Sequence, residues 1–152
     1  TSHNIPSIYF ARAIVKKELG DLEGAIQDYD KALLKDKSYA DALYNRAYSF
    51  KLMGNFNNAL TDANSLIELN PNNPENWNLK GNIQLLFGDY YDAIESYTKA
   101  INIQNDYSEA YYNRGLAYIM TYRPFKGCED FQMCLDFNYT KAQQLIENFC
   151  EN

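Results

Sequence analysis

The sequence of 152 residues contains one histidine and lacks the residue patterns on which common catalytic sites depend. That histidine is His3, close to the N-terminal residue, so a Ser-His-Asp triad or a Cys-His pair has no base within the body of the chain. No glycine-rich phosphate cradle of the Walker or dinucleotide type occurs. Paired acids, Asp28 with Asp30 and Glu129 with Asp130, are expected to be solvated helix surface. We therefore expect no enzyme, and no catalytic, metal-binding or cofactor-binding residues.

Positive charge is also scarce, since 14 Lys and Arg face 20 Asp and Glu, for a formal net charge of -6. This balance argues against nucleic acid and anionic membrane as main partners, because both select clustered Lys and Arg. No apolar run approaches the roughly 18 residues that cross a bilayer, and the start has no basic-then-apolar pattern. Partners that are neutral, basic or apolar are favoured. Because the chain opens with Thr1 rather than Met, we expect a fragment of a longer protein.

Cysteine is rare, and all three cysteines lie in the last quarter of the chain: Cys128, Cys134 and Cys150. An odd count without a C-x-x-C pair argues against a disulfide framework or a zinc site. It indicates a reducing compartment, and we expect a cytoplasmic location. Each cysteine is expected to be structural, with Cys134 a small core residue.

The sequence does contain a repeat with a period of 34 residues. Glycines recur at Gly20, Gly54 and Gly88, and two further series of small residues follow the same step: Ala25, Ala59, Ala93 and Gly127, and Ala13, Ala47, Gly81 and Gly115. A fixed period of this length is typical of a solenoid, in which each unit buries its apolar face by stacking on the next.

The order of residue types identifies the kind of repeat. A closing proline is followed by a large aromatic residue, a small residue, a turn glycine, alanine, an aromatic residue and alanine: Pro71, Trp77, Gly81, Gly88, Ala93, Tyr97 and Ala100. This pattern resembles the tetratricopeptide repeat, and the resemblance spans nearly the whole chain. It implies an all-α, right-handed α-solenoid of four helix-turn-helix repeats followed by a C-terminal capping helix.

We expect a single domain over residues 1–152. Its repeats are placed at residues 6–39, 40–73, 74–107 and 108–141, with the capping helix at 142–151. The fourth repeat departs from the others, because Tyr122 stands where glycine stood three times. We expect its turn to be made differently. Gly127 inside the following helix should cost roughly 1 kcal/mol relative to alanine.

In tetratricopeptide proteins the first helices of the pairs line a concave groove that holds peptides. The resemblance therefore implies a non-catalytic interaction module, or scaffold, that binds a peptide or helix of another protein. Asparagine can hydrogen-bond an extended peptide in both senses, and tyrosine offers contact area with a polar tip. Carried over by position, the groove residues are Phe10, Ile14, Tyr44, Asn45, Tyr48, Asn78, Asn82, Tyr112, Asn113 and Leu116. The aromatic members could instead pack between repeats.

Three alternatives stay open. Co-chaperones of the family grip acidic chaperone tails with a clamp of Lys, Asn and Arg. Asn113 matches the middle position that follows Asn78 and Asn82, but no leading position supplies the lysine, and Gln143 and Glu147 stand where cations should be. The classical acidic-tail clamp is therefore not matched. The chain could instead serve structural self-assembly within a larger protein. A catalytic domain could also lie elsewhere in a longer parent chain.

Overall fold

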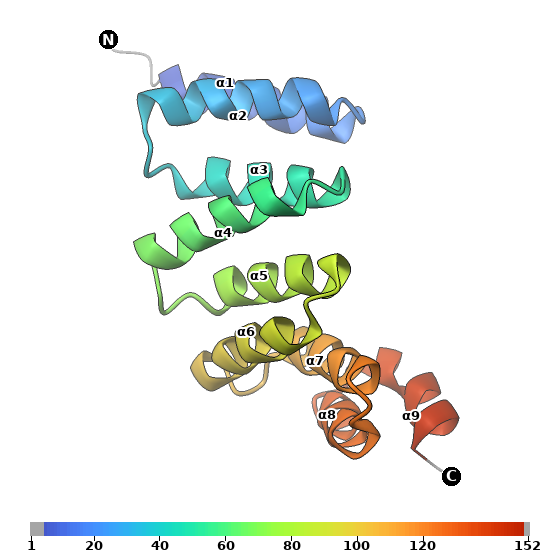
Figure 1. The fold of residues 1–152 in the computed structure, drawn as a ribbon. Helices are drawn as coiled ribbons and strands as arrows, with labels where there is room; N and C mark the ends of the chain where they lie inside the picture. The colour runs from blue at the N-terminus through green and yellow to red at the C-terminus, as the bar shows by residue number, and fades with distance from the viewer. Residues whose placement is uncertain (1–4, 151–152) are drawn as a thin grey trace. The chain divides into compact units, whose positions relative to one another are not determined.

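The computed structural model describes residues 5–150 and is all-α over that range. The chain forms two compact units, the first ending at Pro71 and the second beginning at Asn72. Helices follow one another as antiparallel pairs joined by tight turns (Figure 1). The all-α fold of four helix-turn-helix pairs and a capping helix is confirmed. The single domain over residues 1–152 stays a prediction, and His3 lies outside the described residues.

The first unit consists of two helix pairs. Helix α1 (Ile5–Glu18) pairs with α2 (Leu22–Lys35), and α3 (Ala40–Leu52) pairs with α4 (Phe56–Leu69). The turn between α1 and α2 carries a helix cap, since the Asp21 carboxylate accepts a hydrogen bond from the Gly24 N–H at 2.8 Å. Ala13, Ala25 and Tyr29 are fully buried, so the small residues lie where the paired helices cross.

The second unit contains the third and fourth pairs and the capping helix. Its elements are α5 (Pro74–Phe87), α6 (Tyr90–Ile103), α7 (Ser108–Met120), α8 (Pro124–Asp136), a 3-10 turn (Thr140–Ala142) and α9 (Gln143–Phe149). Pro74 occupies the first turn of α5, and the Asn73 side chain accepts from the Glu75 N–H at 3.0 Å. The proline-rich segment therefore ends one repeat and starts the next, as the sequence predicts.

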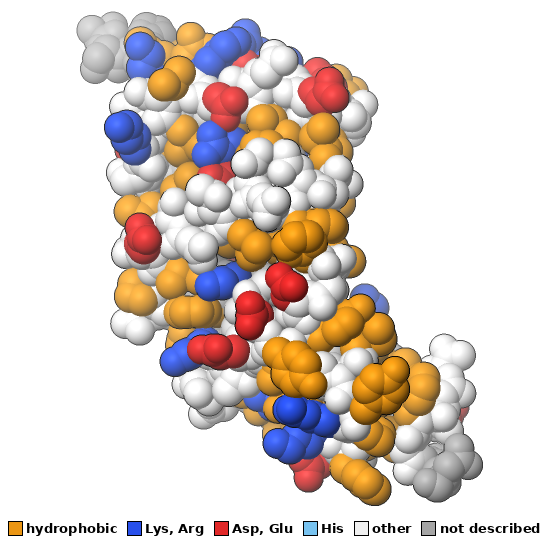
Figure 2. Space-filling view, in the orientation of Figure 1, with side chains coloured by type: hydrophobic (Ala, Val, Ile, Leu, Met, Phe, Trp, Pro, Cys, Tyr) orange, Lys and Arg blue, Asp and Glu red, His pale blue; other side chains and the backbone are white. Residues whose placement is uncertain are grey.

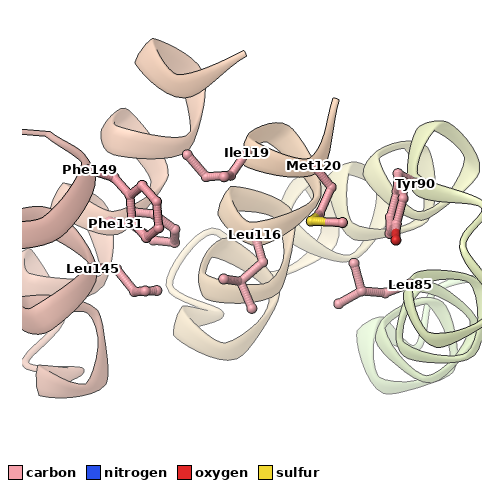
Figure 3. A pocket seen from close by; sticks show the side chains of 8 residues that line it. All are labelled: Leu85, Tyr90, Leu116, Ile119, Met120, Phe131, Leu145 and Phe149. Carbon is pink, nitrogen blue, oxygen red and sulfur yellow. The ribbon is translucent and has the colours of Figure 1, made fainter. Parts of the chain in front are cut away.

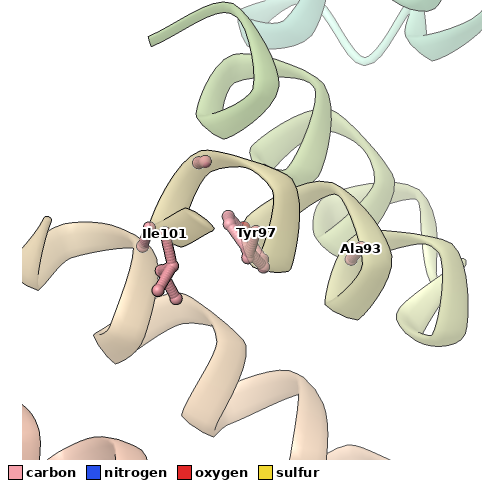
Figure 4. Packing of buried hydrophobic residues seen from close by; sticks show 5 residues of the cluster. Ala93, Tyr97 and Ile101 are labelled. Carbon is pink, nitrogen blue, oxygen red and sulfur yellow. The ribbon is translucent and has the colours of Figure 1, made fainter. Parts of the chain in front are cut away.

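The core of the second unit depends on rings packed against glycine. A Cβ added to Gly81 would lie 2.6 Å from the Tyr97 ring, and one added to Gly115 would lie 2.5 Å from the Phe131 ring. Tyr97 lies on α6 between Ala93 and Ile101 in the buried cluster (Figure 4). Since both contacts join residues 16 apart, the 34-residue period places the same contact in successive repeats.

Gly127 has a packing role that the sequence-based estimate of its cost leaves out. A Cβ at this position would lie 2.9 Å from the Gly115 carbonyl oxygen and 3.0 Å from Ile119. The backbones of α7 and α8 therefore approach closely at this point. The helix-propensity cost of the glycine is offset by the close packing that it allows.

Ion pairs to buried carboxylates accompany these contacts and correct one expectation. Arg12 binds both carboxylate oxygens of Asp28, at 2.7 and 2.6 Å, and Asp28 is fully buried. Arg114 binds Asp130 in the same way at 2.8 and 2.7 Å, and Asp130 is 4% exposed. The expectation that these two acids are solvated surface is therefore wrong. The hydrogen bonds and charge of Arg12 hold the pKa of Asp28 well below its usual range.

The turn at Tyr122 is made in the same way as the glycine turns, which corrects the expectation of a different geometry. Tyr122 has φ of 59°, close to the 74° of Gly54. Its N–H donates to the Ile119 carbonyl at 3.0 Å, and the N–H of Arg123 donates to the Tyr118 carbonyl at 2.8 Å. Two such bonds also close the turn at Gly88. The fourth turn thus keeps the geometry with a residue that is strained in it.

Cys128 and Cys150 form a disulfide that connects α8 to the C-terminal end of α9, with Cα atoms 5.7 Å apart. The expectation of no disulfide is therefore wrong. Two cysteines separated by 22 residues resemble no framework, and only the fold of α9 back onto α8 brings them together. Cys134 is free and buried, as predicted. Burial raises the pKa of its thiol to about 12.

Replacing Tyr122 by glycine should stabilise the fold. The left-handed conformation costs a non-glycine residue about 1–2 kcal/mol, and the Tyr122 side chain is 94% exposed, so little packing is lost. We expect Tyr122→Gly to raise the melting temperature by about 2–8 °C in calorimetry. Gly88→Ala, the reverse change at an equivalent turn, should lower it. A lower melting temperature for Tyr122→Gly would contradict the strain.

Removing the disulfide should destabilise the C-terminal end of the second unit. Opening a loop of 22 residues is expected to cost about 3 kcal/mol through the entropy of the unfolded chain. The Cys128→Ser/Cys150→Ser double variant should therefore unfold at lower urea concentration than the oxidised protein. The unaltered protein reduced with dithiothreitol serves as the matched control and should unfold at the same urea concentration as the double variant. Two titratable thiols in addition to Cys134 in the untreated protein would disprove the pairing.

Candidate functional site

The groove residues expected on α1 take part in packing within the first unit. The Phe10 ring is half-buried and lies 6.0 Å from the Tyr29 ring and 5.1 Å from the Tyr39 ring, measured between centroids. Ile14, one turn later, is also half-buried. These side chains support the helix pair and offer a partner only part of their surface.

The expected residues on α3 present a more open surface. Asn45 accepts a hydrogen bond from Lys17 Nζ at 3.1 Å and donates to the Asp41 carbonyl at 2.9 Å. Tyr48 is 37% exposed, and Lys51 Nζ lies 4.0 Å from its ring centroid. Tyr44 is half-buried. Tyr48 is therefore the side chain of this group with the clearest access to a partner.

In the second unit, four polar side chains on α5 and α7 form one hydrogen-bonded network. Glu109 Oε1 accepts from Asn78 Nδ2 at 3.2 Å and from Asn82 Nδ2 at 3.3 Å. Asn82 Oδ1 accepts from Asn113 Nδ2 at 3.0 Å and from the Tyr97 hydroxyl on α6 at 2.8 Å. The network thus connects three helices. It brings together three of the asparagines that the sequence places in the groove.

Two members of this network are buried, and only Asn78 differs from its expected role. Asn78 is only 5% exposed, and its Oδ1 has no hydrogen-bond partner within the described structure, so it contributes to the floor rather than to an open surface. Tyr97 is fully buried, and burial together with the nearby Glu109 carboxylate raises the pKa of its hydroxyl. Tyr97 therefore stays protonated and donates to Asn82.

The remaining expected residues lie on α7. The half-buried Tyr112 ring lies 6.1 Å from Phe131 and 5.7 Å from Tyr139, so it also packs within the unit. Leu116 lies at the middle of an apolar pocket of about 430 Å³ (Figure 3). Residues from five helices line this pocket: Leu85, Tyr90, Leu116, Ile119, Met120, Phe131, Leu145 and Phe149.

Glu109 and most of the pocket residues were missed by sequence reasoning. Glu109 precedes Asn113 by four residues, as Asn78 precedes Asn82, and 31 residues separate the members of each pair across the two helices. That spacing could have revealed the network. For Met120 and Leu85, helical spacing predicts an apolar face but does not say whether a neighbour covers it.

No group of three or more metal-ligating side chains is present within residues 5–150. None of the described helices has the length and hydropathy needed to cross a membrane.

Removing the Asn82 side chain should cost stability, because it holds three hydrogen bonds and its loss leaves the buried Tyr97 hydroxyl without an acceptor. We expect Asn82→Ala to lower the free energy of unfolding by about 1–3 kcal/mol in urea titration. Asn102→Ala on the exposed side of α6 is the matched control and should change it little. Equal stability of the two variants would show that the network contributes nothing.

Comparison with known proteins identifies the family of the repeats. A family model described as TPR repeat matches residues 13–54 and 81–121, and models described as tetratricopeptide repeat match residues 41–73 and 63–95. The SGT1 homolog of Bos taurus is 31% identical over 90 residues, which cover 59% of this chain and 26% of that protein. The heat shock protein STI1 of Saccharomyces cerevisiae is 31% identical over 84 residues, covering 55% and 14%.

Solved structures show the same fold at lower sequence identity. A crystal structure of MamA has a TM-score of 0.80 at 24% identity and covers 87% of this chain and 78% of its own. TTC0263, a TPR protein of Thermus thermophilus, has a TM-score of 0.75 at 16% identity, with 93% and 82% covered. With the repeat model matched over more than half of its residues, the chain belongs to the tetratricopeptide repeat family.

Proposed function

We propose that the chain is a non-catalytic adaptor module that binds a segment of another protein along the first helices of its pairs. The observation that carries this proposal is the polar network of Asn82, Asn113 and Glu109 beside the apolar pocket at Leu116. Amide and carboxylate groups next to an apolar hollow offer both hydrogen bonds and a place for a side chain. The family membership supports the same conclusion, because repeat solenoids expose extended binding surfaces.

The names of the relatives point to chaperone-related adaptors, among them STI1 and the Hsp70-Hsp90 organizing protein 3 of Arabidopsis thaliana. The chain spans 26% or less of the length of the SGT1 homolog and of these two proteins. A co-chaperone-type adaptor is therefore a second form of the proposal. The ligand would differ from an acidic tail, because the asparagine network surrounds the Glu109 carboxylate instead of a cation.

The Cys128–Cys150 disulfide removes the basis on which a reducing, cytoplasmic compartment was expected. Disulfides persist in oxidising environments and are rare where thiols are kept reduced. We propose that the module works under oxidising conditions.

A photo-crosslinking amino acid tests the proposed binding face. Placed at Tyr48 on α3, p-benzoylphenylalanine should capture a defined partner from an extract of the organism that encodes the chain. Placed at Leu34, which is 77% exposed on α2, the second helix of its pair, it should not capture that partner. Mass spectrometry of the products checks both. Capture of the same protein at both positions, or of no protein at Tyr48, would contradict binding through the first helices.

A further inference from the structure

The net negative charge of the chain is concentrated in the second unit. Residues 72–152 carry 11 Asp and Glu against 6 Lys and Arg, whereas residues 1–71 carry 9 against 8. An excess of exposed negative charge attracts a positively charged partner and raises its rate of association. A partner bound to this unit is therefore favoured when it is basic.

The apolar pocket of the second unit is lined by side chains that water reaches. Met120 and Phe149 are each 51% exposed, and in Figure 3 they lie with Leu116 along a trough between α9 and α5. Hydrophobic side chains also gather over the C-terminal helices in Figure 2. Covering such a surface is favourable by about 25 cal/mol per Å² of apolar area. The volume of about 430 Å³ falls within the usual range of ligand sites.

An acidic hollow of about 290 Å³ adjoins the pocket, and Tyr90 lines both. The hollow contains Asp89 and Asp92, which are exposed. Among the described residues neither carboxylate has a hydrogen bond or ion pair, and Asp89 does not cap its helix with its side chain. The nearby Arg123 guanidinium instead lies 5.1 Å from the Tyr91 ring centroid. Two carboxylates thus remain available beside an apolar trough.

The disulfide fixes the wall of the pocket that α9 provides. Leu145 and Phe149 line the pocket from α9, a helix of seven residues with no fully buried side chain. Helices this short are marginal without tertiary support. Cys150 follows Phe149 directly and is bonded to Cys128 on α8. The disulfide therefore attaches the C-terminal end of this wall to α8.

We propose that this pocket anchors a partner segment in which a bulky apolar side chain is followed closely by Lys or Arg. The apolar side chain fills the trough at Leu116 and Met120, and the cation pairs with Asp89 and Asp92. This inference rests on the proposed function and names the chemistry of the partner.

Three synthetic peptides of equal length and pattern, composed of Leu with Lys, Leu with Glu, or Ser with Lys, test the proposal in fluorescence anisotropy. The oxidised protein should bind the Leu/Lys peptide, with affinities for the other two weaker by about tenfold or more. Met120→Gln should weaken the binding of the Leu/Lys peptide by about fivefold, because the substitution places an amide in the apolar trough. Asp89→Asn/Asp92→Asn should also weaken binding of this peptide by about fivefold. It should make the affinity less dependent on salt concentration, because two charges that salt would screen are gone.

Glu75→Gln is the matched control, since Glu75 is an exposed carboxylate in the first turn of α5, at the opposite end of that helix from Leu85. Its affinity for the Leu/Lys peptide should equal that of the unaltered protein. Equal binding of the Ser/Lys and Leu/Lys peptides, or unchanged affinity in both pocket variants, would overturn the proposal. Dimers in sedimentation that Met120→Gln converts to monomers would also overturn it, in favour of a second copy as the occupant.

The two proposals fail separately. Tyr48 lies in the first unit, outside the pocket, so a partner captured there while the peptides fail to discriminate leaves the adaptor role and removes the anchor. No capture at Tyr48 removes binding through α3, and peptides that still discriminate then confine the binding site to the second unit.

Discussion

The close crossing of the two helices within each pair is the constraint on which the other features depend. Gly81 and Gly115 leave no room for a side chain, because rings from the partner helix occupy that space. In the first pair Ala13 and Tyr29, both fully buried, hold the equivalent positions. Helices can approach this closely only where side chains are short, so the period of small residues sets the distance between the helices.

The polar interactions follow from this packing. Arg114 and Asp130 precede Gly115 and Phe131 by one residue each, so the contact between glycine and ring also aligns the ion pair. Buried pairs of this type contribute mainly when every group is satisfied, which the bidentate geometry achieves. Tyr97 extends past Gly81, and its hydroxyl reaches Asn82. The core of the third repeat thereby supports the network at the candidate binding face.

The second unit combines features that a recognition surface needs. A buried ring positions the asparagines, and a short disulfide-linked helix completes the apolar trough. The carboxylates of Asp89 and Asp92, which form no hydrogen bond or ion pair among the described residues, lie in the adjoining hollow. The Asn82 side chain belongs to the candidate binding face and also accepts the hydrogen bond of the buried Tyr97 hydroxyl, so changes at this position affect both the surface and the core.

The sequence by itself determined the all-α class, the four helix pairs, the turns at Gly20, Gly54 and Gly88, and the start of α5 at Pro74. These features depend on residue size and backbone freedom at a fixed spacing, which are properties of the chain alone. Only the tertiary structure decided that Cys128 meets Cys150, that Tyr122 adopts the conformation of a turn glycine, and that Asn78 is buried while Met120 remains open. These depend on which helix faces are covered and on distances between residues far apart in sequence, and a periodic pattern contains no such information.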